Sequence, residues 1–186
     1  MQLTNMPGFD AAVMEFVQNR LHTPFTDAFF PFITHLGEAG AVWLCTAVLL
    51  LCFKKTRTTG VLVLLTMLLT FVTGELCLKN LFCRPRPCHV FPEIPLLVTR
   101  PTSFSFPSGH SASSFTAAVM LFLRHKKAWP ALLLAAGIAF SRVFLFVHYP
   151  TDILAGALLG TVFAIAVYLV YSKTGLCKGR FPHRST

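Results

Sequence analysis

Long apolar stretches separated by short polar segments dominate the chain. Five of them approach the roughly 20 residues that a helix needs to cross a bilayer, and they cover about residues 26–53, 58–82, 109–123, 128–147 and 151–171. The first is longer than one span and contains Pro31 and Gly37, so we expect a kinked helix, or a short interfacial helix that leads into the span. The third is short and rich in Ser and Thr, which predicts a helix buried inside the bundle.

A further segment, residues 9–21, places apolar side chains at helical spacing with polar ones between them. It predicts an amphipathic helix lying on the membrane. The start of the chain lacks the basic region, short apolar core and cleavage site of a secretory signal, so we expect no cleaved peptide. The pattern predicts an all-α fold: a polytopic membrane helix bundle of about five transmembrane helices plus the N-terminal amphipathic helix, in a single domain over residues 1–186.

Composition also indicates a membrane protein. Of 186 residues, 54% are hydrophobic and 12% are charged, and the mean hydropathy is +0.65, which is too apolar for an ordinary soluble domain. The net charge of +9 raises the question of a nucleic-acid partner. Because the basic residues are spread over loops that flank the spans rather than along one soluble face, we expect no such partner.

The basic residues predict the orientation instead. Alternation of the spans places ten of the sixteen Lys and Arg residues on one side of the membrane and six on the other. The more basic side is expected to be cytoplasmic. Its residues are Lys54, Lys55, Arg57, Arg124, Lys126, Lys127, Lys173, Lys178, Arg180 and Arg184.

The six cysteines form no pattern that resembles a zinc site, and we expect no cofactor. Cys83 and Cys88 bracket a short basic segment on the side predicted to be oxidising. Either a local disulfide or two free thiols fits this sequence, since the separation and angles of the pair decide between them. The other four cysteines lie in spans or in the C-terminal tail.

Three basic residues at the ends of apolar segments, Lys79, Arg86 and Arg142, are the first candidates for chemistry. Ionisable side chains are costly at membrane depth, so their presence there favours function. Together they can stabilise the negative charge on the non-bridging oxygens of a phosphoryl group. Phosphoryl transfer depends mainly on such charge stabilisation and on positioning. The alternative is that arginines at span ends anchor the protein by reaching toward lipid headgroups.

The segment Pro107 to His110 begins the third span. Ser108 can cap the helix, and Gly109 lets an anion approach the free backbone amides. On its own such a segment is merely a cap or a turn. Here His110 follows at once and places a proton donor beside the predicted anion cradle.

His148 ends the fourth span, and Asp152 follows it by four residues. The carboxylate can turn back to accept the ring proton, which leaves the other ring nitrogen as a nucleophile. The alternative is a His–Asp pair that only closes the turn between two helices.

These blocks resemble the tripartite signature of the type 2 phosphatidic acid phosphatase family, which is related to bacterial acid phosphatases, glucose-6-phosphatase and vanadium haloperoxidases. Lys79 is followed after six residues by Arg86-Pro87, the second block is Pro107 to His110, and Arg142 precedes His148 by five intervening residues. The resemblance covers residues 79–152 and implies catalysis without a metal. It implies a phosphate pocket of Lys79, Arg86, Ser108, Gly109 and Arg142, with His148 as nucleophile, Asp152 orienting it and His110 as general acid.

The resemblance implies an integral membrane lipid phosphatase that works through a phosphohistidine. An extracytoplasmic site and compact size favour undecaprenyl pyrophosphate as the substrate. The alternatives are phosphatidylglycerophosphate or phosphatidate phosphatase, a lipid phosphotransferase, a non-enzymatic lipid-phosphate carrier, and a metal enzyme built on the two histidines and the aspartate. The expected partners are a lipid phosphate and the bilayer, and the sequence leaves the oligomeric state open.

Three further features concern the number of spans, the loop 88–106 and the ionisable residues outside the three blocks. Relatives commonly have six spans where we expect five, which leaves open how the lipid reaches the site. The loop 88–106 is either an extracytoplasmic cap that gates the lipid or an inert loop packed on the bundle. Glu75, one turn before Lys79, can pair with it, whereas His35 and Glu38 match no block.

Overall fold

The computed structural model describes residues 8–174, and every regular element in that range is helical. The predictions that concern Cys177, Lys178, Arg180 and Arg184 lie outside the described residues. The elements are α1 (Gly8–Arg20), α2 (Pro24–Leu36), η1 (Glu38–Gly40), α3 (Ala41–Leu51), α4 (Arg57–Phe71), η2 (Val72–Leu78), α5 (Lys79–Phe82), α6 (Pro87–Val90), α7 (Gly109–Arg124), η3 (Lys126–Ala128), α8 (Pro130–Phe144) and α9 (Pro150–Lys173).

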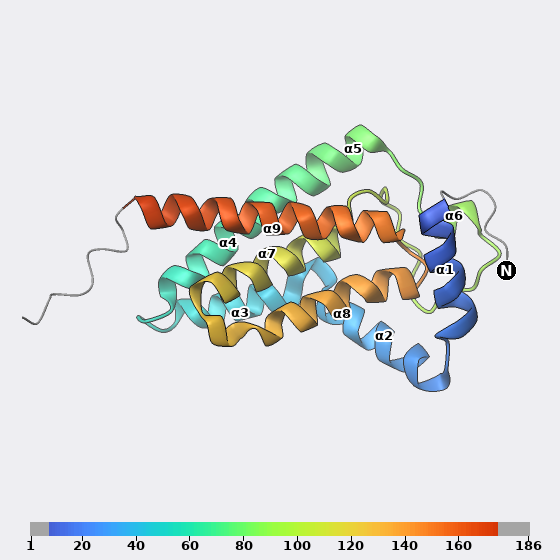
Figure 1. Cartoon of the computed structure of the whole chain (residues 1–186), viewed down its shortest axis with the longest axis horizontal. Helices are drawn as coiled ribbons and strands as arrows, with labels where there is room; N and C mark the ends of the chain where they lie inside the picture. Colours follow the sequence, from blue (N-terminus) through green and yellow to red (C-terminus); the bar gives the residue numbers. More distant parts are fainter. Residues whose placement is uncertain (1–7, 175–186) are drawn as a thin grey trace, which may run out of the picture.

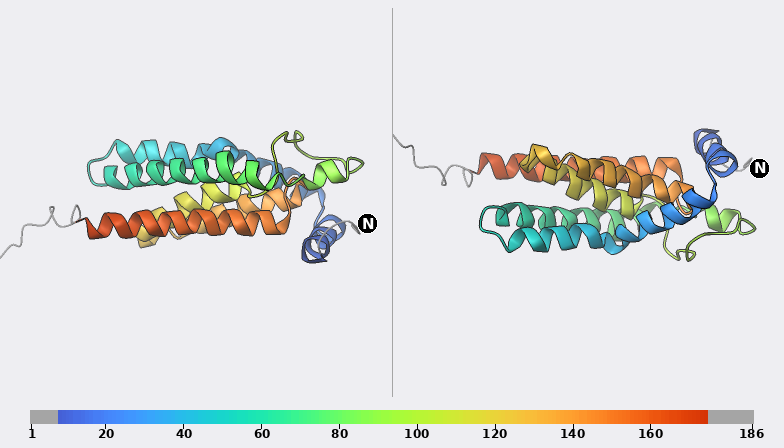
Figure 2. Two further views of the ribbon diagram at one scale, coloured as in Figure 1. Left: turned by 90° about the horizontal axis from the view of Figure 1, so that it is seen from above. Right: turned by 90° about the horizontal axis from the view of Figure 1, so that it is seen from below.

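Helix α7 forms the centre of the bundle. It packs most extensively against α9, then against α8 and α4. Figure 2 shows α3 and α4 on one side of it and α8 and α9 on the other. Helix α1 lies across one end of the bundle, nearly perpendicular to the long helices (Figure 1). The predicted helical bundle with a separate N-terminal helix is therefore confirmed.

Two glycines of α9 allow the close contact between α7 and α9. A Cβ atom at Gly156 would lie 2.5 Å from the carbonyl oxygen of Ser108, and one at Gly160 would collide with the carbonyl oxygen of Ala112. Both obstacles are backbone atoms, which cannot move aside as a flexible side chain can. The start of α7, in the second sequence block, therefore sits directly beside the start of α9, where the third block ends.

Among residues 8–174, three segments are long and apolar enough to cross a membrane: the one that begins at Arg57, the one that ends at Phe144, and α9. A fourth is counted if α2 and η1–α3, which are bent by 44°, form one broken span. The bend lies at Gly37–Gly40, where Ala39 and Gly40 have φ of 49° and 71°, and not at Pro31. Helix α7 is shorter than these segments, and its Ser111, Ser114 and Thr116 are buried as expected.

The second apolar run is a continuous rod of α4, η2 and α5 (Figure 1). Its middle part, η2, is a π-helix, a form that occurs mainly as short insertions and often near functional sites. It ends immediately before Lys79 and contains Glu75. After α5 the chain turns at Cys83, whose φ is 45°. Cys83 is exposed and Cys88 is buried, and both are free thiols.

Candidate active site

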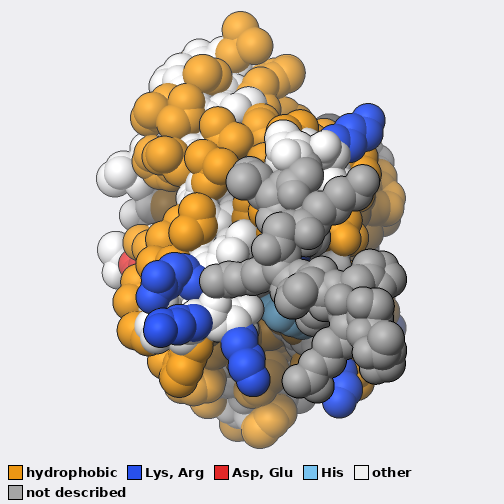
Figure 3. Space-filling model, turned by 90° about the vertical axis from the view of Figure 1, so that its left-hand side faces the viewer, with side chains coloured by type: hydrophobic (Ala, Val, Ile, Leu, Met, Phe, Trp, Pro, Cys, Tyr) orange, Lys and Arg blue, Asp and Glu red, His pale blue; other side chains and the backbone are white. Residues whose placement is uncertain are grey.

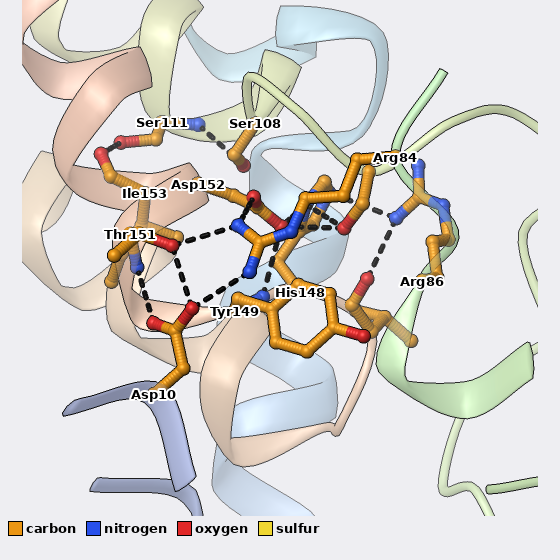
Figure 4. Close-up of polar contacts among 12 residues, drawn as sticks. Asp10, Arg84, Arg86, Ser108, Ser111, His148, Tyr149, Thr151, Asp152 and Ile153 are labelled. Carbon is orange, nitrogen blue, oxygen red and sulfur yellow. Dashed lines mark hydrogen bonds and ion pairs between the residues drawn. The ribbon is translucent and has the colours of Figure 1, made fainter. Parts of the chain in front are cut away.

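Direct contacts fasten the first turn of α7 to the first turn of α9. The backbone amide of Ser108 donates to the carbonyl oxygen of Asp152 at 3.1 Å, and the Ser111 hydroxyl donates to the carbonyl oxygen of Ile153 at 2.7 Å. As predicted, Ser108 is the N-cap of α7. Its Oγ accepts a hydrogen bond from the Ser111 amide at 3.4 Å. The second and third blocks therefore meet at one point (Figure 4).

The three basic residues of the predicted phosphate pocket are buried rather than turned toward lipid headgroups. Lys79, Arg86 and Arg142 are 6%, 3% and 7% exposed. Arg142 donates to the hydroxyl of Thr34 at 2.7 Å, while its Nε has no partner in the described part of the chain. A buried, unpaired guanidinium donor is costly, so the arrangement favours a site that binds an anion over surface anchoring.

Arg86 and His148 are in direct contact. The Nη1 atom of Arg86 lies 2.9 Å from Nε2 of His148 and also donates to the carbonyl oxygen of Val147. A guanidinium only donates hydrogen bonds, so Nε2 is the acceptor and the ring proton is on Nδ1. Burial lowers the pKa of His148 well below its ordinary value, and the nearby charges of Arg86, Arg142 and Lys79 lower it further. The ring is therefore neutral, and the lone pair on Nε2 accepts the hydrogen bond from Arg86.

Asp152 faces the other nitrogen of the same ring. Its Oδ2 lies 3.4 Å from Nδ1 of His148 and accepts from the Ser105 hydroxyl at 2.5 Å and from the Tyr149 amide at 2.9 Å. The carboxylate thus caps the start of α9 and also faces the ring proton. The turn-closing role and the orienting role that the sequence left open are both compatible with this geometry.

A cavity of about 810 Å³ connects these groups. Lys79, Arg86, His110, Arg142 and His148 are among the residues that line it. Loop residues 98–103 also line it, so the loop after α6 forms part of the site rather than an inert surface. Its other walls include the apolar side chains of Leu44, Leu64, Met67, Leu68 and Phe71, which come from α3 and α4.

Two side-chain pairs also line the cavity, and the sequence predicted the first of them. Glu75 accepts from the Lys79 ammonium at 2.8 Å, and its carboxylate lies against Gly109, where a Cβ atom would displace it. His35 and Glu38 form a 3.1 Å pair at the break between α2 and α3 and remain largely exposed. Glu75 therefore offsets one of the three positive charges at the site.

The sequence did not identify four residues of this site. Ser103 accepts two hydrogen bonds from Arg86, one at its carbonyl oxygen and one at its hydroxyl, and Ser105 contacts Asp152. Arg84 forms one ion pair with Asp10 and a second with Asp152. Only Arg84 carried a local signal, because it stands two positions before Arg86 in the same basic segment. The other three depend on contacts between distant parts of the chain.

Within residues 8–174, no three His, Cys, Asp or Glu side chains come together in a way that could hold a metal ion. The alternative of a metal enzyme built on His110, His148 and Asp152 therefore has no ligand cluster in this part of the chain.

Comparison with known proteins agrees with this description. Residues 58–176 match the PAP2 superfamily. The undecaprenyl-diphosphatase of Sulfolobus acidocaldarius is 37% identical over 123 residues, which are 64% of this chain but only 59% of that protein. The decaprenylphosphoryl-5-phosphoribose phosphatase of Mycobacterium tuberculosis is 36% identical over 161 residues, which are 86% of this chain and 89% of that protein.

A solved structure extends the likeness to the fold. The PAP2 type phosphatidylglycerolphosphate phosphatase of Bacillus subtilis superposes with a TM-score of 0.75 and is 28% identical, covering 93% of this chain and 87% of that one. The family that the three sequence blocks resembled is thereby confirmed. The chain belongs to the PAP2 superfamily, and it is an all-helical membrane protein of that family.

Proposed function

We propose that the protein is an integral membrane lipid phosphatase that hydrolyses a polyprenyl diphosphate through a phosphohistidine intermediate. One observation carries the proposal: the unprotonated Nε2 of His148 and three buried cations lie at a single cavity that apolar side chains of α3 and α4 also line. The cations suit a phosphate group, and the apolar side chains suit the start of a lipid chain. The relatives support it, since two of them act on prenyl-linked phosphates by their names.

The chemistry follows from the placement of the two histidines. Nε2 of His148 attacks the terminal phosphorus in line, a P–N bond forms, and the P–O bond to the lipid phosphate breaks. His110 donates a proton to the leaving oxygen. Water, deprotonated by His110, then attacks the phosphorus, breaks the P–N bond and releases inorganic phosphate. Lys79, Arg86 and Arg142 stabilise the charge on the non-bridging oxygens in both steps.

Arg86 must change its hydrogen bonds during this cycle. In the described structure it donates to the nitrogen that is to act as nucleophile. A bound phosphate offers Arg86 a charged acceptor, which makes a stronger hydrogen bond than a neutral ring nitrogen. Substrate binding would therefore draw Arg86 away and free the His148 lone pair for attack.

A second substrate class has a specific observation in its favour. This chain spans 89% of the decaprenylphosphoryl-5-phosphoribose phosphatase but only 59% of the undecaprenyl-diphosphatase. A phosphate monoester on a prenyl-linked sugar is therefore the second candidate. A phosphotransferase would use the same residues, and it differs in requiring a lipid acceptor for turnover.

Competition between substrates tests the assignment. We expect the purified protein to release phosphate from undecaprenyl diphosphate with a kcat/KM at least about tenfold higher than from phosphatidate or phosphatidylglycerophosphate in the same detergent, a difference of about 1.4 kcal/mol in transition-state binding. Phosphate release is measured with all substrates in one mixture. Preference for a monoester would reject the diphosphate but keep the phosphatase, and dependence on an added lipid acceptor would indicate a transferase.

We further propose that the site faces the extracytoplasmic side. The end of the bundle opposite α1 is ringed by basic side chains (Figure 3). They come from the turn before α4, the turn between α7 and α8, and the end of α9. Because positively charged segments remain in the cytoplasm, this end is assigned to the cytoplasmic side and the active site to the opposite one.

Labelling in intact cells tests the orientation. In a variant whose native cysteines are replaced, a membrane-impermeant thiol reagent should modify a cysteine at Glu93 and leave one at Lys126 unmodified. Permeabilised cells provide the control, because both positions should then react. Labelling at Lys126 alone in intact cells would place the site in the cytoplasm.

A further inference from the structure

Arg84 bridges two fully buried carboxylates (Figure 4). Its Nη1 donates to Oδ1 of Asp152 and its Nη2 donates to Oδ2 of Asp10, each at 2.7 Å. Both aspartates are 0% exposed. The planar guanidinium presents its donors in a fixed fork, so the two carboxylates are held at a defined separation and angle.

The same contacts fasten α1 to the start of α9. Asp10, in the first turn of α1, accepts from the backbone amide of Thr151 at 2.9 Å and from its hydroxyl at 2.8 Å. Arg84 also donates to that hydroxyl and lies over the ring of Tyr149, with 3.9 Å between Cζ and the ring centroid. Asp10 therefore fixes both the guanidinium and the helix turn that carries Asp152.

The two oxygens of Asp152 have separate partners. Oδ1 accepts from Arg84, while Oδ2 faces His148, Ser105 and the Tyr149 amide. Rotation of the carboxylate would break hydrogen bonds on both sides at once. Without Arg84, two buried carboxylates would lose their common cation, and removal of one partner from a buried ion pair is strongly unfavourable.

A contact that only tied α1 to the bundle would not need to reach Asp152. The packing of Met14 and Val17, which are 0% and 1% exposed, against the site end of the bundle already serves that purpose. Arg84 instead contacts the carboxylate that faces the His148 ring. Phe9 and Phe16 of the same helix are 56% and 59% exposed, which leaves one side of α1 free to contact the membrane.

We propose that Arg84 is a positioning residue for Asp152, and that Asp10 holds Arg84 in place, so that the docked N-terminal helix sets the orientation of the His148 ring. This inference rests on the proposed function, in which His148 is the nucleophile. Full activity then requires the contact between Asp10 of the docked α1 and Arg84.

Variants of the full-length protein test this. Arg84→Gln should lower kcat about tenfold to a hundredfold, because small misplacements of a reacting group have effects of that size. KM should change less than about twofold, since the phosphate-binding cations are untouched. Asp10→Asn should lower kcat several-fold in the same way. Asp27→Asn is the matched control, because that carboxylate pairs only with His22 on the described surface, and it should leave kcat unchanged.

A double variant separates positioning from general destabilisation. If Asp10 acts through Arg84, the Asp10→Asn and Arg84→Gln double variant should lose no more kcat than Arg84→Gln alone. In rapid-quench experiments, the rate constant for formation of the phosphohistidine should fall in Arg84→Gln. Losses that multiply, or a rise in KM at constant kcat, would overturn the proposal.

Two further comparisons keep the outcomes distinct. If Arg84→Gln does not fold, Arg84→Lys is used, which retains the charge but cannot bridge both carboxylates, and wild-type kcat in that variant contradicts the proposal. An inactive His148→Ala beside a fully active Arg84→Gln would reject this inference alone. An active His148→Ala would reject the proposed function first.

Discussion

Replacement of His148 by alanine is expected to reduce phosphate release by about 10⁴-fold or more, because a nucleophile and its base act as a unit whose loss removes most of the catalysis. Lipid binding should persist, since Lys79, Arg86 and Arg142 remain. Steady-state release of inorganic phosphate measures the first effect, and equilibrium binding of the lipid to the purified variant measures the second.

His125→Ala is the matched control for that variant. His125 contacts Thr59 at the opposite end of the bundle, so its loss should leave turnover unchanged. Vanadate, which adopts the five-coordinate geometry of the phosphoryl transition state, should inhibit the wild type. Turnover by His148→Ala at near the wild-type rate would contradict a covalent mechanism.

Arg86→Lys is expected to have the second-largest effect, about 10²-fold to 10³-fold on kcat/KM, which is the range for loss of one donor to a developing oxyanion. Lysine keeps the charge but replaces the fork that donates to Ser103, Val147 and His148. It cannot restore these hydrogen bonds together. Phosphate release at subsaturating substrate measures the loss directly.

Arg57→Lys provides the comparison for Arg86→Lys. Arg57 is exposed at the opposite end of the bundle and makes one hydrogen bond, at 3.4 Å, to a backbone carbonyl. Its replacement should change kcat/KM by less than about twofold. If Arg86→Lys behaves in the same way, the positive charge alone is sufficient and the proposed fork geometry has no catalytic role.

Much of the site could be predicted because its residues occur in short segments with fixed spacing. Ser108 caps α7 as expected, and His148 and Asp152 lie on either side of one turn, close enough for a local prediction. The alternation of the apolar runs predicts that all three blocks lie on the same side of the membrane, and the structure brings them to one cavity. Their roles in catalysis remain proposals that the variants above test.

Other features could not be predicted, because no local pattern encodes them. Asp10 lies 74 residues from Arg84 and 141 from Thr151 in the chain. Ser103 and Ser105 are unremarkable loop serines until the loop folds over Arg86 and Asp152. The sequence predicts a kink in the first long run, which also contains Pro31, but it does not place the bend at residues 37–40.

The sequence by itself determined the helical class, the buried position of α7 and the family, and it predicted which basic and histidine side chains form the site. These depend on apolar periodicity and on residue spacing, which are local properties. Only the tertiary structure decided which ring nitrogen of His148 accepts a hydrogen bond from Arg86, how Glu75 offsets Lys79, and that α1 reaches Asp152 through Arg84. Those features depend on which buried groups pair across the bundle, and hydrogen bonds between distant segments form only when the helices have packed.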